Sequence, residues 1–486
     1  MTFPFGWLCA FCVRSQPLRH RQIAAGFVGN FRHRRRARFA FYNSSSIPAG
    51  AAMKFLHTRL AALTLLFCGS ALAHETPQSV DAALERARSE HSPVLIDFQA
   101  QWCYSCYFMN TNVLTGKEWN AALKRVVLVQ ADADSPDGAA WMKKLSVKAL
   151  PSYVVLNPDG SELGRILAEQ PRDKFYPALD RILGGRDALD TLKTQAASGS
   201  NSALADALAS YEARGQAADG LAWFASLSDA VTMAAQHDKK AATRLAQLEM
   251  EKAAKDKNTH ECVVQAQRML AGDPGCDRYY AIDTLLECSE KLPADERKSA
   301  LAMQRPALKA LLDKQVFVAT PTCADQRSAV IAAADLDKAL GDAAAERAVL
   351  DRGIAAAQHT LGGDLRRDRN AADNQRVYLV RAQRQSEVDA LMPKLIAAYP
   401  DDYVYAYRHG KSLLERGQAA VALPFLEQAS QKAFGVNRLS VANARAKALL
   451  ALNRRADAEK VVAEALEANG PWFPEAAAKL KAVLKS

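Results

Sequence analysis

The stretch QWCYSC, residues 101–106, decides how the first folded part of the chain is interpreted. Two cysteines held two residues apart are typical of half a zinc site, of two inert buried residues, or of a dithiol that opens and closes a disulfide. Zinc needs about four ligands, and the sequence offers only His91 nearby. The other pair with this spacing, Cys9 and Cys12, lies in the N-terminal segment that is expected to be lost with the leader. We therefore expect no metal here, and the flanking residues decide between the other two interpretations.

The residues around the pair predict a strand followed by a helix. Val94 to Phe98 is a short apolar run with Asp97 as its one acidic residue, and the segment after the cysteines is broadly helical. Cys103 thus falls near a helix N-terminus, where unpaired N–H groups and the helix dipole stabilise an anion. Such a placement lowers a cysteine pKa from about 8.5 to roughly 3.5–7.5. We expect an exposed, nucleophilic Cys103 and a shielded Cys106.

The following residues predict a small α/β domain. The expected elements after the helix are a strand at 126–130, a helix at 138–145, two strands at 153–156 and 162–167 joined by the turn Asn-Pro-Asp-Gly, and a helix at 174–183. The order is β-α-β-α-β-β-α. Pro151 stands directly before the third strand.

Residues 80–185 resemble a thioredoxin-fold domain. The resemblance rests on Asp97-Phe98, on Trp102-Cys103-x-x-Cys106, and on Leu150-Pro151-Ser152 before a strand–turn–strand. It is similar in particular to the periplasmic C-terminal domain of the transmembrane thiol–disulfide interchange reductases. A lone CxxC is a weak signal, whereas this set of motifs is specific.

The resemblance implies a role for each matching residue. Cys103 would attack a substrate disulfide, Cys106 would resolve the mixed disulfide, and buried Asp97 would accept the Cys106 proton. Pro151 would be cis and lie against the dithiol, and the backbone of Leu150 would pair with substrate. Structural alternatives stay open: Asp97 as a buried acid without a redox role, and Pro151 as a trans loop proline.

Three departures from thioredoxin itself leave redox direction and substrate open. Tyr104-Ser105 replaces Gly-Pro between the cysteines, and we expect both residues, with Trp102, to border the substrate. Trp102 is equally compatible with packing. Gln130 stands where a lysine is common, and Gln99 where a tryptophan is common.

The N-terminal segment has the features of a targeting sequence. From Met53, two basic residues, an apolar stretch and Ala71-Leu72-Ala73 form a secretory signal peptide over 53–73, which predicts export to the periplasm. Residues 1–52 fit poorly before a signal and are expected to be a gene-model extension or a disordered basic segment; an uncleaved anchor and an organelle transit peptide are alternatives. Residues 1–73 hold ten Lys and Arg and no acid, which leaves 53 basic and 53 acidic residues in 74–486. Residues 74–486 therefore lack the excess of basic residues that is typical of nucleic-acid-binding proteins.

The rest of the chain is expected to be all-α. We predict a thioredoxin-like domain at 74–185, a linker at 186–205, and a helical-repeat domain at 206–486, clearest at 335–470. LLERGQAAVALPFLEQAS at 413–430 aligns with LLALNRRADAEKVVAEAL at 449–466, with Gly417 against Asn453 and with Gly341 in a similar turn earlier. The period resembles tetratricopeptide repeats, which stack into a solenoid. Such an array would bind a peptide or protein, or would merely stabilise the first domain.

Four cysteines in the helical part suggest two disulfides in an oxidising compartment. Proximity along the chain favours Cys262 with Cys276 or Cys288, and Cys323 with the remaining one. The alternative is that they are small buried apolar residues.

The sequence as a whole predicts an exported protein-disulfide reductase without an organic cofactor. Its partners would be protein disulfides, a dithiol electron donor and a polypeptide bound by the repeats. Two other hypotheses remain: a non-catalytic scaffold with a thioredoxin-fold platform, and a disulfide oxidase or isomerase using the same cysteines.

Overall fold

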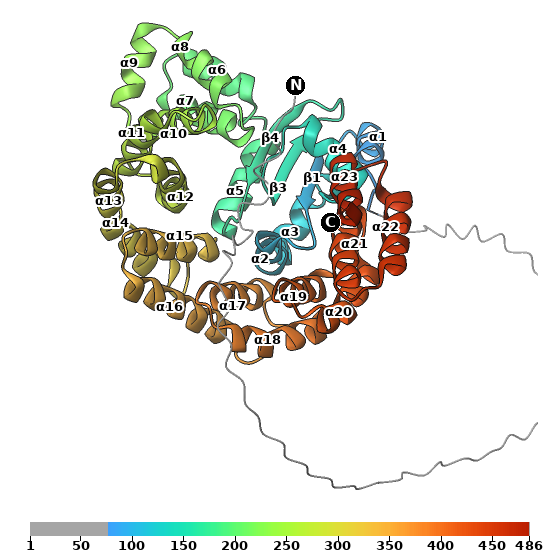
Figure 1. Ribbon diagram of the computed structural model, residues 1–486. Helices are drawn as coiled ribbons and strands as arrows, with labels where there is room; N and C mark the ends of the chain where they lie inside the picture. The colour runs from blue at the N-terminus through green and yellow to red at the C-terminus, as the bar shows by residue number, and fades with distance from the viewer. Residues whose placement is uncertain (1–75, 486) are drawn as a thin grey trace, which may run out of the picture. The chain divides into compact units, whose positions relative to one another are not determined.

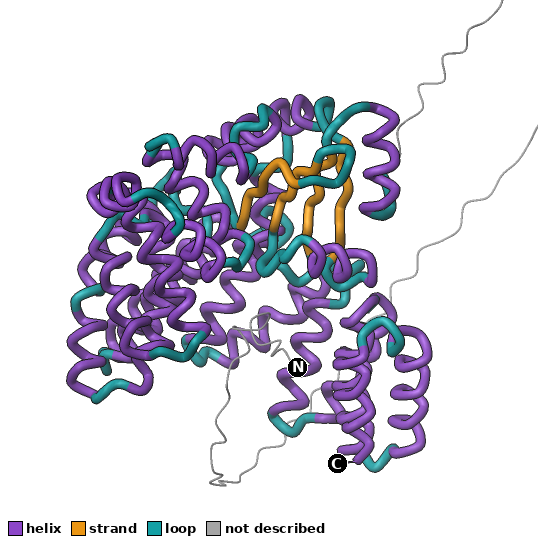
Figure 2. The backbone as a smooth tube through the Cα atoms, turned by 90° about the horizontal axis from the view of Figure 1, so that it is seen from above, coloured by secondary structure: helices purple, strands orange, loops and turns teal. Residues whose placement is uncertain are grey.

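The computed structural model of the protein describes residues 76–485. A four-stranded mixed sheet lies in the first part of this range. Its strands are β1 Val94–Gln99, β2 Val127–Asp132, β3 Ser152–Leu156 and β4 Glu162–Leu167. They lie in the order β2-β1-β3-β4, with β1 parallel to β2 and antiparallel to β3, and with β3 antiparallel to β4. Figure 2 shows the strands side by side in one sheet.

Five helices belong to this sheet: α1 Val80–Glu90, α2 Tyr104–Asn112, α3 Gly116–Ala122, α4 Pro136–Lys144 and α5 Arg172–Leu183. Alternate residues of β1 pack on opposite faces. Ile96 and Phe98 pack with residues of α1 and α4, whereas Leu95 packs with residues of α2, α3 and α5. A strand buried on both faces is expected to be apolar on both, which explains the apolar run at 94–98 that only Asp97 interrupts.

The sheet domain differs from the sequence prediction in two local features. α1 precedes the first strand and was not predicted. The single helix expected after the cysteines is divided into α2 and α3, because the chain turns at 113–115 and Gly116 then adopts a left-handed φ of +77°. A residue with a side chain adopts that conformation at a cost, so glycine marks the break.

The remainder of the described chain is helical. Its first helices are α6 Leu189–Ala197, α7 Asn201–Ala213, α8 Ala217–Ala225, α9 Asp229–His237, α10 Lys239–Lys255, α11 Thr259–Ala271, α12 Arg278–Cys288, α13 Ala294–Ala302 and α14 Arg305–Leu311. The later ones are α15 Gln326–Ala339, α16 Ala343–Leu361, α17 Arg369–Arg381, α18 Gln385–Ala398, α19 Val404–Glu415, α20 Ala419–Lys432, α21 Gly435–Ala451, α22 Arg455–Asn469 and α23 Pro474–Ala482.

The stretch expected to be a linker, residues 186–205, is instead mostly helical. It contains α6 and the start of α7, which pack on each other. Leu192 and Ala196 of α6 are buried, at 5% and 0% exposure. The polar composition of this stretch concealed the few apolar residues that form its buried side.

Helix pairs recur where the sequence repeats. α15 packs on α16, α19 on α20, and α21 on α22. Gly341, Gly417 and Asn453 connect these three pairs, and all three have left-handed φ values of +79°, +75° and +60°. The residues that aligned in sequence therefore share one turn conformation.

The helices run in an arc around the sheet domain (Figure 1). At one end Arg214, which caps α7, binds Glu162 of β4 at 2.7 Å. In the middle α17 packs on α2. At the far end the N–H of Val436 in α21 donates to the carbonyl of Asp134, 3.1 Å away. The arc thus contacts the sheet domain at both ends and in the middle.

Membrane-spanning character is missing from this part of the protein: among residues 76–485, no helix has both the length and the apolar composition that crossing a bilayer requires.

Candidate functional site

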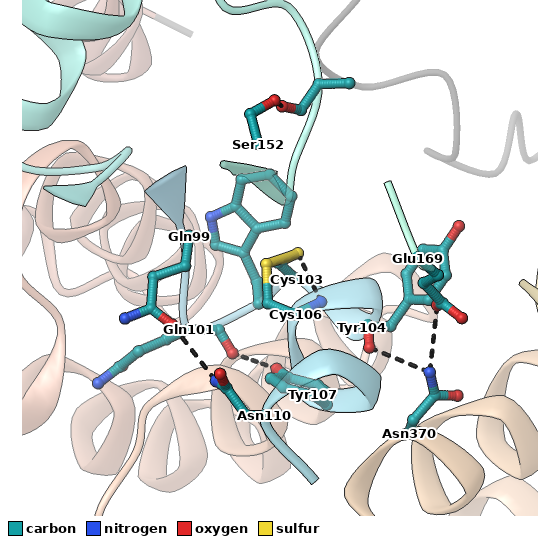
Figure 3. The surroundings of a disulfide bond; sticks show 12 residues. Gln99, Gln101, Cys103, Tyr104, Cys106, Tyr107, Asn110, Ser152, Glu169 and Asn370 are labelled. Atoms are coloured by element: carbon teal, nitrogen blue, oxygen red, sulfur yellow. Dashed lines mark hydrogen bonds between the residues drawn. A yellow bond between two sulfur atoms is a disulfide. The ribbon is translucent and has the colours of Figure 1, made fainter. Parts of the chain in front are cut away.

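The two cysteines lie at the start of α2, as the strand–helix pattern predicted. Cys103 is the N-cap residue of α2, and its Sγ accepts a hydrogen bond from the backbone N–H of Cys106 at 3.1 Å. The two sulfurs form a disulfide (Figure 3). A helix N-terminus with an N–H aimed at sulfur is a favourable site for a thiolate once the disulfide is reduced.

Cys103 is more buried than expected. Its exposure is 4%, and that of Cys106 is 2%. The strand–helix pattern of the sheet domain alone predicted an exposed first cysteine. That prediction was wrong, because helices hundreds of residues later in the chain pack on the residues on either side of Cys103.

Asp97 lies inside the domain on β1. It is 2% exposed, and its register partner on β2 is Gln130. Burial raises the pKa of Asp97 to about 7, and a hydrogen bond with Gln130 partly opposes this rise. A carboxyl group poised near neutrality can accept a proton at physiological pH and return it.

The Leu150–Pro151 peptide bond is cis. Leu150 packs in a small apolar cluster with Ala100, Cys103 and Cys106. The chain just before β3 therefore lies against the dithiol, as the resemblance implied.

Trp102 and Tyr104, expected to border a substrate, contact helices of the same chain. The Trp102 indole N–H donates to Asp134 at 2.7 Å, and its ring packs in a cluster that contains Tyr403 and Phe434. The Tyr104 ring lies under the guanidinium of Arg327, 3.7 Å from centroid to Cζ.

Ser105 forms a hydrogen bond with the carboxyl group of Glu169, a residue that the sequence did not indicate as part of the site. Glu169, just after β4, is 7% exposed, and its Oε1 accepts a hydrogen bond from Asn370 at 3.2 Å. Burial raises the pKa of Glu169 well above its ordinary range, and Asp325 adds to this, while hydrogen bonds from Ser105 and Asn370 oppose it. No motif surrounds Glu169, so only folding places it beside Asn370, which also donates to the carbonyl of Tyr104 between the cysteines (Figure 3).

The four cysteines of the helical part form two disulfides. Cys262 of α11 pairs with Cys288 at the end of α12, and Cys276 pairs with Cys323 just before α15. The sequence left Cys276 and Cys288 as alternatives for Cys262. Within residues 76–485 no group of three or more His, Cys, Asp or Glu side chains is arranged to hold a metal ion.

The signal peptide expected at 53–73 and the segment 1–52 lie outside the described residues.

The fold and the site define a class. Residues 75–158 match the thioredoxin-like family model. This part of the chain is a thioredoxin-like domain, and the expected combination of a thioredoxin fold with a helical remainder is confirmed.

The chain is also similar in sequence to individual thiol:disulfide interchange proteins. The chain is 35% identical over 112 residues to the thiol:disulfide interchange protein DsbD of Ralstonia nicotianae. The matched residues make up 22% of this chain and 18% of that protein. It is 36% identical over 90 residues to the DsbD of Pseudomonas fluorescens, covering 18% and 15%. The chain therefore spans less than a fifth of the length of these curated relatives.

Two solved structures are also similar. The C-terminal domain of Neisseria meningitidis DsbD in its reduced form is 30% identical, with 21% of this chain and 91% of that chain covered and a TM-score of 0.19. A thioredoxin from Thermus thermophilus is 28% identical, with 22% and 84% covered and a TM-score of 0.21.

Proposed function

We propose that the protein is a thiol–disulfide oxidoreductase that reduces disulfides in other proteins through Cys103 and Cys106. The observation that carries the proposal is the position of Cys103 as the N-cap of α2, with the Cys106 N–H donating to its sulfur at 3.1 Å. The similarity of this region to thiol:disulfide interchange proteins supports it.

The reaction takes place in two exchanges. The Cys103 thiolate attacks one sulfur of the substrate disulfide, forms a mixed disulfide and releases the other sulfur as a thiolate. Cys106 then gives its proton to Asp97 and attacks the Cys103 sulfur. This step forms the Cys103–Cys106 disulfide and releases the second substrate thiolate. Two electrons pass to the substrate, and a dithiol donor protein restores them.

The surrounding residues serve this sequence in the proposal. Asp97 is the proton acceptor, because its pKa of about 7 suits it to take and return a proton. The cis Leu150–Pro151 segment presents backbone for pairing with the substrate. We further propose that the chain is exported to the periplasm by the signal beginning at Met53, and that the helical part recruits a polypeptide partner.

A non-catalytic binding platform is the second candidate. It is favoured by the 4% exposure of Cys103 and by the contacts of Trp102 and Tyr104 with the helices. The reverse reaction, in which the disulfide form oxidises substrates, uses the same groups and differs only in reduction potential.

The test is disulfide reduction by the full chain, with a model protein disulfide such as insulin and a chemical dithiol as electron donor. Cys103→Ser is expected to abolish the reaction, and Cys106→Ser to accumulate the mixed disulfide through Cys103. Cys9→Ser combined with Cys12→Ser is the matched control, because this pair has the same spacing and lies outside the described residues, and it is expected to behave as the wild type. Equal activity in wild type and Cys103→Ser would remove the catalytic role and leave the binding platform.

A further inference from the structure

The helical part holds the backbone on both sides of the nucleophile. The carbonyl of Trp102, the residue before Cys103, accepts a hydrogen bond from Arg408 Nη2 of α19 at 3.3 Å. The carbonyl of Tyr104, the residue after it, accepts one from Asn370 Nδ2 of α17 at 3.1 Å. The conformation of the loop that carries Cys103 is thus fixed from two helices outside the thioredoxin-like domain.

The Tyr104 side chain adds a third helix to this contact. Its hydroxyl lies 3.1 Å from Ser328 Oγ and donates to Asp325 Oδ2 at 3.4 Å, both at the start of α15. Its ring stacks on Arg327 of the same helix. Tyr104 is one of the two residues between the cysteines and directly follows Cys103 in the chain.

The charged side chains of α15, α17 and α19 next to the Cys103 loop carry an excess of positive charge. Asp373 of α17 is 0% exposed and binds three guanidinium groups, those of Arg327, Arg376 and Arg408, at 2.7–2.8 Å. The pKa of Asp373 is held well below its ordinary range by these arginines, despite the opposing effect of burial. One carboxylate therefore faces three cations.

Other charged groups around the loop do not cancel this excess. Asp325 supplies one further carboxylate, which accepts a hydrogen bond from Tyr280 at 2.7 Å. Arg369, which stacks on Tyr107, is paired with Asp402.

Burial shifts the ionisation of nearby carboxyl groups on the domain side to higher pH. Burial raises the pKa of Glu169 well above its ordinary range, and it raises the pKa of Asp97 to about 7 and that of Asp132 to about 6. Burial also raises the pKa of Asp134, against hydrogen bonds from Asn437 and Trp102.

We propose that α15, α17 and α19 act on the dithiol directly: Arg408 and its arginine cluster stabilise the Cys103 thiolate, and Arg408 and Asn370 position the loop that bears it. A stabilised thiolate makes the reduced form of a dithiol more stable and its disulfide more oxidising. The helical part is then a determinant of redox potential as well as a framework. This inference rests on the proposed function, because it concerns the same cysteine pair.

The test compares Arg408→Gln with Arg408→Lys in the full chain, in a background where Cys9, Cys12 and Cys68 are serine. Arg408→Gln removes one cation but leaves Asp373 bound to Arg327 and Arg376, so no buried carboxylate loses all its partners. Arg416→Gln is the matched control, because Arg416 lies just beyond α19 and pairs with Asp389 of α18.

Two readouts are needed. The first is the ultraviolet thiolate absorbance of Cys103 against pH with Cys106→Ser added, so that Cys103 is the free thiol of the pair. The second is the equilibrium between dithiol and disulfide in a series of thiol buffers, with mass spectrometry to identify the alkylated cysteines. We expect Arg408→Gln to raise the pH midpoint of thiolate formation by about one unit and to shift the redox equilibrium about tenfold toward the disulfide, which equals about 30 mV. Arg408→Lys should recover most of both effects, and Arg416→Gln should change neither.

The outcomes separate the inference from the proposed function. Suppose that the wild type converts reversibly between dithiol and disulfide, and that Arg408→Gln folds with the same thiolate midpoint and the same reduction potential. This result overturns the inference and leaves the proposed function in place. A wild type without reversible conversion contradicts the function, and the inference with it. If Arg408→Gln does not fold, Arg376→Gln removes a cation of the same cluster without touching the loop backbone. It should raise the midpoint in the same direction, and no change would overturn the inference.

Discussion

At the scale of single residues, the proposed thiol–disulfide exchange depends on where two groups lie relative to α2. Cys103 is at its N-cap, and Asp97 is buried on the strand that precedes it. Both positions could be predicted, because a strand, a CxxC motif and a helix follow one another within a few residues. Glu169, Asn370 and Arg408 could not be predicted. Asn370 is 266 residues from Tyr104 and Arg408 is 306 residues from Trp102, and nothing local in the sequence encodes such contacts.

Replacing Asp97 by Asn should slow the second exchange. Without a proton acceptor for Cys106, the mixed disulfide is expected to persist about 100-fold longer, at the lower end of the usual contribution of a general base. The first attack by Cys103 should keep its rate. Rapid acid quenching followed by alkylation and mass spectrometry measures both steps, and a mixed disulfide with the wild-type lifetime would exclude the role of Asp97.

The same substitution should alter how stability depends on pH. The pKa of Asp97 is raised from 3.8 to about 7 by burial, so between these values the folded protein holds a proton that the unfolded chain has released. The contribution of Asp97 is therefore fully present below about pH 4 and is lost as the pH rises through 7. At about 1.4 kcal/mol per pKa unit, the loss amounts to about 4 kcal/mol. Denaturant unfolding of wild type and Asp97→Asn at pH 4 and pH 8 should show the wild type losing this much relative to the variant; parallel curves would contradict the assignment.

At the scale of elements, the sequence predicted the strands of the sheet domain well and the helix boundaries less well. β4 spans the predicted residues, and the other strands differ from prediction by one or two residues at their ends. The break between α2 and α3 and the helix α6 were missed, because a single left-handed glycine and two buried apolar residues are weak signals within otherwise polar stretches. Where a turn residue recurred, as at Gly417 and Asn453, the helix pair was found.

The junction between α21 and the sheet domain can be tested at Gly435. A Cβ at this position would lie 1.8 Å from the carbonyl oxygen of Asp134, and φ is +52°. Gly435→Ala should therefore lower the free energy of unfolding by about 1–2 kcal/mol because of the left-handed backbone and by a further 1–3 kcal/mol because of the clash. Gly417→Ala is the matched control, because its φ is +75° and no atom lies within 4 Å of the added Cβ. Equal losses of stability in the two variants would show that the junction does not form.

At the scale of the whole molecule, the chain combines a thioredoxin-like domain with helices that return to it. The sequence predicted the two classes of structure and their order. It did not predict that the helices would pack on the dithiol, because this depends on how each of the eighteen helices along residues 189–482 packs on its neighbours. The burial of Cys103 is the consequence, and it makes the helices part of the candidate site.

The two helical disulfides should stabilise this arrangement to different degrees. The Cys262–Cys288 bond closes a separation of 26 residues and the Cys276–Cys323 bond one of 47. Loop entropy predicts contributions of about 3.5 and about 4 kcal/mol. Replacing each pair by alanine and measuring thermal unfolding tests this expectation. An unchanged midpoint in either double variant would mean that the bond is absent in solution or contributes nothing.

The most direct test of the central claim is the reduction potential of the Cys103–Cys106 pair in the full chain, measured by equilibration with thiol buffers, alkylation and mass spectrometry, with Cys103→Ser as control. One reversible two-electron transition, confined to these two cysteines, is expected. A potential toward the thioredoxin end of the range, about −270 mV, supports a reductase, and one near −120 mV supports the oxidising direction. The absence of any reversible transition would contradict the claim that this site carries out thiol–disulfide exchange.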